Sequence, residues 1–206
     1  MISKTIDTSA PILPAFAERY SGVSYDPQRP LSRSQLLALA EAARWAPSCF
    51  GDQPWRYIIC DKATDPEAWD KAFACLAEGN QAWCKAAPVL MISCADTLFA
   101  RNDKSNRYGS HDTGAASFGM CLQAASMGLM THQMGGFDSA KARSLFAIPE
   151  RYQPMAMMSV GYQLPEERLP PEFRDKELAP RVRNPLGKNF FLGAWDKGLE
   201  PDNQEG

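Results

Sequence analysis

The sequence predicts an α+β fold in a single domain spanning residues 1–206. Segments with helix start signals are interspersed with apolar runs of strand length. The chain is long enough to bury a substantial core without disulfide staples. Its composition, 45% hydrophobic and 22% charged, is that of an ordinary globular protein. No internal repeat divides it.

Two helices in the first half are predicted from their start signals. Ser32 and Gln35 have capping-box spacing ahead of an apolar run, which predicts a helix from about Arg33 to Trp45. Asp65-Pro66 combines an N-cap residue with proline at the first helical position. The second helix is therefore expected to begin there, to bury its apolar residues through Leu76 and to end near Gly79. A further short helix is expected over residues 80–87.

Short apolar runs predict the strands. The run at residues 57–60 is the first, and Val89–Ala95 is continuous enough to indicate a central strand buried on both faces. Residues 129–134 and 155–161 are two further strands. A short helix is predicted between them at residues 139–146.

A long helix is predicted from Asp112 to Met127, closed by Gly128. Its interior glycines, Gly114 and Gly119, each cost about 1 kcal/mol against alanine, so they need a packing reason. Small residues permit close approach of a neighbouring helix or of a symmetry mate. The simpler alternative is a core helix packed on its own sheet.

The segment from residue 164 onward has a different character. Prolines at positions 165, 170, 171, 180 and 185 preclude a long helix, yet the segment is too apolar for a free tail, with aromatics at Phe190, Phe191 and Trp195. We expect residues 164–206 to form an extended arm that buries these side chains on a surface of this chain or of a second subunit.

Charge and composition exclude several function classes. A net charge of −2 gives no general attraction to nucleic acid or to a membrane surface, so neither is an expected partner. No segment has the length or apolarity of a signal peptide or a membrane span, so we expect a cytoplasmic protein. The six cysteines form no Cys-x-x-Cys pair and the chain has only two histidines, which predicts buried free thiols and no metal site.

The most informative segment lies between the first helix and the first strand. Pro47 and Pro54 stiffen its two ends, because proline fixes φ and restricts the residue before it. A stiff polar loop containing Ser48, Cys49 and Gln53 suits the binding of a flat ligand. An ordinary connection with a packed tryptophan is the alternative.

The remaining polar candidates are scattered along the chain. No phosphate-binding glycine motif, Walker loop or hydrolase nucleophile motif is present. Scattered polar residues without an acid–base set suit an enzyme whose cofactor carries the chemistry. The candidates outside the loop are Arg19-Tyr20-Ser21, Asn80, Gly135-Gly136, Arg181 and Arg183.

The loop from Pro47 to Trp55 resembles the Pro-Ser-x-x-x-x-Gln-Pro-Trp motif of the FMN-dependent nitroreductase family. The resemblance extends in the family's motif order from about Ala15 to Trp195. It implies a nitroreductase-like fold, in which helices flank a mostly antiparallel central sheet. It also implies a homodimer in which the C-terminal arm wraps the partner subunit.

The resemblance assigns roles to the scattered residues. Arg19-Tyr20-Ser21 resembles the Arg-x-Ser that grips the FMN phosphate, and Arg181 and Arg183 match the basic pair that completes this grip. Guanidinium groups suit a phosphate dianion. Each arginine taken alone would be read as a solvated surface charge.

Other motif positions are matched to the flavin ring. Asn80 has the spacing before Pro88 of the asparagine that bonds the pyrimidine edge, although it would also suit a helix cap. Met134-Gly135-Gly136 resembles the segment whose amides approach ring N5, and a simple strand-to-helix turn is the alternative. The partner subunit is expected to contribute the loop residues Pro47, Ser48, Cys49, Gly51 and Gln53.

The implied reaction is ping-pong transfer of hydride from NADH or NADPH to FMN, and then of two electrons to a nitroaromatic, quinone or activated alkene. No catalytic side chain is expected, which makes His111, His132 and Cys49 bystanders. Val23 departs from the family pattern, since many members carry a basic residue there. The alternatives are a flavoenzyme of the same fold that oxidises or dehalogenates a small metabolite, and a catalytically idle flavin-binding or scaffold protein.

Overall fold

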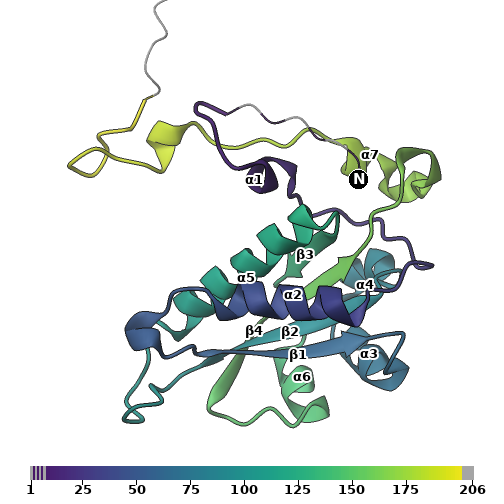
Figure 1. Ribbon diagram of the computed structural model, residues 1–206, viewed down its shortest axis with the longest axis horizontal. Coiled ribbons are helices and arrows are strands. Elements are labelled where there is room, and N and C mark those ends of the chain that lie inside the picture. The colour runs from purple at the N-terminus through teal and green to yellow at the C-terminus, as the bar shows by residue number, and fades with distance from the viewer. Residues whose placement is uncertain (1, 3, 5, 7, 201–206) are drawn as a thin grey trace, which may run out of the picture.

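The computed structural model describes residues 2, 4, 6 and 8–200 and contains a four-stranded sheet between two layers of helices (Figure 1). The strands are β1 (Trp55–Asp61), β2 (Val89–Asp96), β3 (Met130–Met134) and β4 (Tyr152–Gly161), in the order β1-β2-β4-β3. All three neighbouring pairs are antiparallel, as expected. β2 lies between β1 and β4 and every residue of it is buried, which confirms the predicted central strand.

Helices cover both faces of this sheet. On one face lie α2 (Arg33–Arg44) and α5 (Gly109–Ser126), and on the other α3 (Pro66–Phe73), α4 (Glu78–Cys84) and α6 (Ser139–Leu145) (Figure 1). Side chains alternate along β2: Val89 and Met91 join the core under α2 and α5, whereas Leu90 and Ile92 join the core under the other layer. β3 is left at the edge of the sheet.

Two predicted helix starts are confirmed in atomic detail. The Ser32 hydroxyl accepts a hydrogen bond from the Gln35 amide at 3.2 Å, and the Gln35 side chain accepts one from the Ser32 amide at 2.9 Å. Asp65 caps α3 by accepting from the Ala68 amide at 2.9 Å.

The expected end of the second helix near Gly79 is wrong. α3 ends at Phe73, and Gly79 lies inside α4. The chain turns between the two helices because Leu76 pairs with Phe137, while the Ala77 amide donates to the Gly136 carbonyl at 3.0 Å. This pairing with a distant segment replaces the intrahelical bonds and leaves no sequence-local signal.

The long helix α5 begins three residues earlier than expected and ends as expected, before Gly128 at φ +70°. Its Gly119 has the predicted packing reason: a Cβ there would lie 3.2 Å from the Ala42 carbonyl oxygen of α2. At Gly114 a Cβ would meet none of the described atoms within 4 Å.

The C-terminal segment runs away from the sheet across the top of Figure 1. It contains short 3-10 turns at Glu166–Arg168 and Leu186–Lys188, the eight-residue helix α7 (Pro171–Leu178), and a terminal turn closed between Phe191 and Gly198. A short helix that was not predicted, α1 (Pro14–Glu18), lies beneath it and packs on α5. Residues 201–206 of the predicted arm lie outside the described residues.

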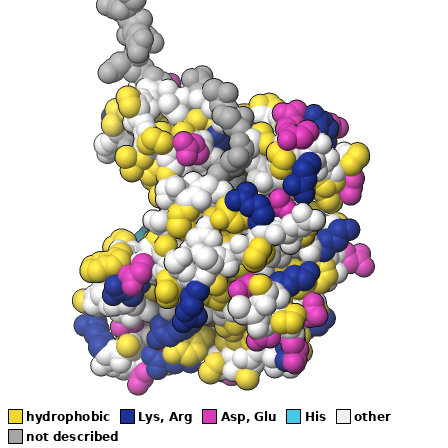
Figure 2. All heavy atoms as spheres, turned by 45° about the vertical axis from the view of Figure 1, so that its right-hand side comes forward, with side chains coloured by type: hydrophobic (Ala, Val, Ile, Leu, Met, Phe, Trp, Pro, Cys, Tyr) yellow, Lys and Arg dark blue, Asp and Glu magenta, His cyan; other side chains and the backbone are white. Residues whose placement is uncertain are grey.

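The arm exposes apolar surface. Phe190 and Leu192 are more than half exposed and Trp195 is 82% exposed. Figure 2 shows hydrophobic side chains on the projecting part that carries the end of the described chain. This chain therefore does not bury these side chains itself, and exchange of the arm between subunits stays a prediction.

In the described part, none of the helices is long and apolar enough to cross a membrane.

All six cysteines are free, and five of them are buried, as predicted. Burial raises the pKa of the Cys60 and Cys84 thiols to about 12, so both remain protonated at neutral pH. Cys49 is the partly exposed exception.

Candidate functional site

The irregular segment Arg19–Val23, here called the Arg19–Val23 turn, follows α1 and contacts the edge strand β3 through His132. Ser21 is exposed, whereas Tyr20, Gly22 and Val23 on either side of it are buried. The Arg19 Nη1 atom lies 3.4 Å from the Ser21 hydroxyl oxygen. A guanidinium group and an exposed hydroxyl are thus presented together.

The two C-terminal arginines come close to this turn but differ in their bonding. Arg181 Nη1 donates to the Arg19 carbonyl at 2.8 Å, and Nη2 donates to the carbonyls of Lys4 and Ala17. Its Nε is buried without a partner among the described residues. Arg183 is exposed, and its Nη1 donates to the Val182 carbonyl at 2.9 Å.

The charges of these arginines affect one another. Burial lowers the pKa of Arg181, and the nearby positive charges of Arg19 and Arg183 lower it further. Such a cluster of like charges favours an anionic ligand, because a bound anion removes the repulsion between its members. The structure therefore brings Arg19, Ser21, Arg181 and Arg183 together from opposite ends of the sequence.

A buried polar network beneath the turn was missed in the sequence analysis. Glu177 of α7, 1% exposed, accepts hydrogen bonds from the Val23 amide and from the Tyr20 hydroxyl, the latter at 3.2 Å. Gln163 donates to both the Tyr20 hydroxyl and Glu177. Burial, reinforced by the Glu177 charge, raises the pKa of Tyr20 well above its usual value. No motif marks Glu177 or Gln163, so only the tertiary structure reveals them.

Tyr20 thus points inward, away from the exposed face that carries Ser21. His132, expected to be a bystander, also contacts the turn: its Nδ1 atom lies 2.9 Å from the Gly22 carbonyl oxygen. Because a carbonyl can only accept, Nδ1 carries the hydrogen in this bond. Burial lowers the pKa of His132, and the bond to Gly22 opposes that shift.

Asn80 and the glycine pair meet at the far end of β3. The Asn80 side-chain Nδ2 donates to the Gly136 carbonyl at 2.9 Å. Asn80 lies within α4, whose N-cap is Ala77, so the helix-cap alternative for Asn80 is wrong. Met134, the last residue of β3, is buried. A Cβ at Gly136 would come within 2.8 Å of Asn80 Nδ2, whereas one at Gly135 would meet none of the described atoms within 4 Å.

The edge strand β3 connects these two groups of residues. His132 contacts the Arg19–Val23 turn, and Gly135 follows three residues later. A strand rises about 3.3 Å per residue, so the two contact points lie about 10 Å apart along the strand direction. An edge strand is not covered on its free side by another strand of the sheet. The arrangement suits an elongated ligand with an anionic end and a flat end.

The Pro47–Gln53 loop lies in a different part of the fold from the residues described above. Figure 1 shows it at the C-terminal end of α2, at the opposite end of that helix from α4. The Cys49 amide donates to Asp112 at 2.9 Å, and the Gln53 amide donates to Ser48 Oγ at 3.0 Å. The loop is tightly wound, with φ of +58° at Phe50, +68° at Gly51 and +48° at Gln53. One chain alone therefore does not bring this loop to the other candidate residues.

Asp112 was not predicted as a functional residue. It is buried in the first turn of α5, where a carboxylate is favoured, and there it holds the loop through the Cys49 amide. The other Asp112 carboxylate oxygen lies 3.0 Å from His111 Nδ1. The side chains of Ser48 and Asp112 thus hold the part of the loop between the two prolines.

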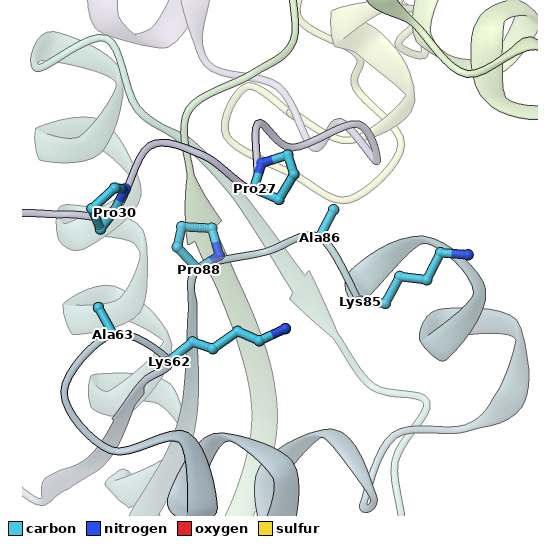
Figure 3. A pocket seen from close by; sticks show the side chains of 7 residues that line it. All are labelled: Pro27, Pro30, Lys62, Ala63, Lys85, Ala86 and Pro88. Atoms are coloured by element: carbon cyan, nitrogen blue, oxygen red, sulfur yellow. The ribbon is translucent and has the colours of Figure 1, made fainter.

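A small surface hollow of about 270 Å³ lies away from all these residues (Figure 3). Pro27, Pro30 and Pro88 line it, and Lys62 and Lys85 stand beside it with their ammonium groups apart. Lys62 Nζ sits 4.0 Å from the Trp69 ring centroid. None of the sequence-predicted site residues contributes to this hollow.

Both a family model and individual known proteins match this chain. The model of the nitroreductase family matches residues 16–162. An uncharacterized 15.4 kDa protein of Mycolicibacterium smegmatis is 30% identical over 150 residues, which cover 70% of this chain and 99% of the relative. The major NAD(P)H-flavin oxidoreductase of Aliivibrio fischeri is 28% identical over 93 residues, covering 45% of this chain and 43% of the relative.

A solved structure of an oxidoreductase containing FMN superposes with a TM-score of 0.85 and 30% sequence identity. The match covers 95% of this chain and 98% of that one. The predicted architecture, an antiparallel sheet flanked by helices, is thereby confirmed.

Proposed function

Because this chain belongs to the nitroreductase family, we propose that it is an FMN-dependent oxidoreductase that uses NADH or NADPH to reduce a small organic acceptor. The main support is the arrangement along β3, where an arginine cluster lies at one end and an asparagine with an unobstructed glycine at the other. The similar protein of known structure contains FMN, and the Aliivibrio fischeri relative is named for NAD(P)H and flavin.

The residues present fit FMN at its phosphate end. Arg19, Ser21 and Arg183 would hold the phosphate, and Arg181 would add positive charge while fixing the turn through the Arg19 carbonyl. Arg181 Nε is buried and has no partner among the described residues, so this guanidinium contributes to the site mainly through its charge. A phosphate of charge near −2 suits such a cluster of guanidinium groups.

The ring end fits as well. Asn80 would bond the polar edge of the ring, and the open space at Gly135 would allow the backbone within hydrogen-bonding distance of it. When bound, FMN supplies the chemistry, by accepting hydride from the nicotinamide and passing on two electrons. The protein positions the ring and stabilises charge on it with amides.

The active species is proposed to be a homodimer. In a dimer the Pro47–Gln53 loop of one subunit would lie over the flavin held by the other, and the arm would cover apolar surface that each chain leaves exposed alone. Six free thiols suit a reducing compartment, which supports action in the cytoplasm.

The proposed sequence is ping-pong. The nicotinamide nucleotide and the acceptor would use the open space beside Gly135 in turn. The favoured acceptors are nitroaromatics, quinones and activated alkenes.

Anaerobic stopped-flow absorbance tests this function. The flavin-loaded protein is mixed with NADH or NADPH, and bleaching of the flavin is followed before an acceptor panel is added. Bleaching followed by recovery with an acceptor supports the proposal. A flavin that neither nucleotide reduces indicates a specialised flavoenzyme if a small metabolite reduces it, and an idle flavin protein if none does.

The variant Cys49→Ser serves as a control for a thiol mechanism. Cys49 contributes its backbone amide to the loop, so the serine variant should bleach within about a few-fold of the parent rate. Loss of bleaching in this variant would place a reactive thiol in the site instead.

A further inference from the structure

We infer that Glu177 and His132 are positioning residues that together fix the Gly22–Val23 peptide group and so order the turn that presents Arg19 and Ser21 to the flavin phosphate. The inference rests on the proposed function. Neither side chain is placed in contact with the phosphate itself.

The two side chains bond opposite ends of one peptide group. The carbonyl of Gly22 accepts from His132 Nδ1 at 2.9 Å, and the adjoining amide of Val23 donates to Glu177. In a trans peptide these two groups point in opposite directions. His132 on β3 and Glu177 on α7 therefore hold the peptide from two sides, and rotating it would break both bonds.

The packing around position 22 leaves no room for a side chain unless Met130 and Glu177 move. A Cβ there would lie within 3.1 Å of both carboxylate oxygens of Glu177 and would overlap the Met130 sulfur. The absence of a side chain allows the carboxylate to reach the Val23 amide directly. Glu177 is 1% exposed and receives two further bonds, from Tyr20 and Gln163, so its own position is determined.

Glu177 and His132, together called the clamp, also constrain the exposed residue Ser21 next to the peptide they hold. Ser21 lies between buried Tyr20, whose hydroxyl bonds Glu177, and the clamped peptide. Tyr20 before Ser21 and the Val23 amide after it are thus bonded to the same carboxylate, and the Ser21 hydroxyl lies on the exposed side, 3.4 Å from Arg19 Nη1. A turn ordered before binding loses less conformational entropy when the anion arrives.

Removing the clamp is expected to weaken binding of the phosphate group selectively. The probes are FMN and riboflavin, which differ only in the phosphate, and their dissociation constants are measured by quenching of flavin fluorescence. In Glu177→Leu the FMN constant should rise about tenfold or more, while the riboflavin constant changes by less than about threefold. Glu177→Gln keeps an acceptor for the Val23 amide and should restore the preference for FMN. Glu172→Gln, an exposed position on the same helix, is the control.

Amide hydrogen exchange provides a second readout without any flavin. The Val23 amide should exchange slowly in the parent and in Glu177→Gln, and rapidly in Glu177→Leu. If Glu177→Leu does not fold, the same FMN and riboflavin titrations are made on His132→Leu and His132→Asn. Asparagine retains a hydrogen-bond donor near the Gly22 carbonyl, whereas leucine does not. His132→Asn should keep the FMN preference and His132→Leu should lose it.

The outcomes separate the two proposals. A parent protein that binds riboflavin as tightly as FMN would overturn the phosphate site and with it the proposed function. A parent that prefers FMN, together with leucine variants that keep this preference, would leave the function standing and overturn the clamp. An equal loss of both ligands in the leucine variants would also overturn it, because that result indicates general destabilisation.

Discussion

Gly135 and Gly136 are neighbours in the sequence with different surroundings. Gly136 packs against Asn80, and an added Cβ would fall 2.8 Å from its side-chain nitrogen. At Gly135 the same atom would meet none of the described residues, and φ there is not positive. A side chain at Gly135 is therefore compatible with the chain itself, and its effect would report on a ligand.

We expect Gly135→Val to fold with parental stability but to load and reduce flavin poorly. The valine would occupy the space that the proposed ring needs, without straining the protein. Thermal unfolding of the flavin-free protein measures the first effect, and flavin absorbance after reconstitution measures the second. Gly136→Ala is the counterpart, expected to lower stability through Asn80. Full flavin loading and reduction by Gly135→Val would show that the ring lies elsewhere.

Arg183 and Arg181 are two residues apart and are expected to respond differently to substitution. Arg183 is exposed and bonded to a neighbouring carbonyl, so Arg183→Ala should leave the protein folded. Loss of one charge-assisted contact should weaken FMN binding about ten- to a hundredfold, giving largely colourless protein. Arg181→Ala should in addition reduce thermal stability, since its guanidinium bonds three carbonyls. Stoichiometric FMN in purified Arg183→Ala would contradict the assignment.

At the scale of the element, the helix starts show what local chemistry specifies. The capping box of α2 and the Asp65 cap of α3 depend on residues three apart, and both form as predicted. The same helix α2 packs closely on α5 at Gly119 and leads into the Pro47–Gln53 loop. The N-terminal cap of α2 therefore helps to fix the position of the helix from which that loop extends.

We expect Ser32→Ala to destabilise the protein by about 1 kcal/mol, because the Gln35 amide loses its acceptor at the N-terminus of α2. Urea unfolding at neutral pH measures this change. Ser144→Ala, at an exposed position inside α6, is the matched control and should be nearly neutral. Equal effects of the two substitutions would show that the cap contributes little.

Other elements depended on contacts that no local pattern contains. The early end of α3 follows from the pairing of Leu76 with Phe137, sixty-one positions later in the chain. The candidate site likewise combines residues that sequence motifs indicate with residues that only tertiary contacts reveal. Arg19, Ser21 and Asn80 could be selected from the sequence because they lie in motifs that resemble those of the family, whereas Glu177 and His132 act through backbone groups of the turn at positions 22 and 23. Only the folded chain reveals such partners.

At the scale of the whole molecule, the arm is the part that one chain cannot account for. It carries exposed Phe190, Leu192 and Trp195 on a segment that extends away from the sheet (Figure 1, Figure 2). Exposed apolar groups of this size, gathered on one segment, commonly mark an interface. A second copy of the chain is the proposed partner.

The proposed dimer of a chain ending at Arg183 should dissociate into monomers more readily than that of the full chain, and it should retain less flavin. It keeps Glu177 and both C-terminal arginines but lacks the exposed aromatic residues. Light scattering across a dilution series gives the mass, and the ratio of flavin to protein absorbance gives the loading. A chain ending at Glu200 controls for shortening alone. A monomeric truncated protein with full flavin content and activity would refute the dimeric site.

The dependence of the Arg19–Val23 turn on Glu177 has a consequence for biosynthesis. Ribosomes release a chain from its N-terminus, so the turn emerges more than 150 positions before the carboxylate that anchors it. The proposed anion-binding end of the site is therefore not ordered until α7 has left the exit tunnel. Cofactor uptake would be a post-translational event confined to nearly complete chains, and prematurely terminated products would stay empty and open to quality-control proteases.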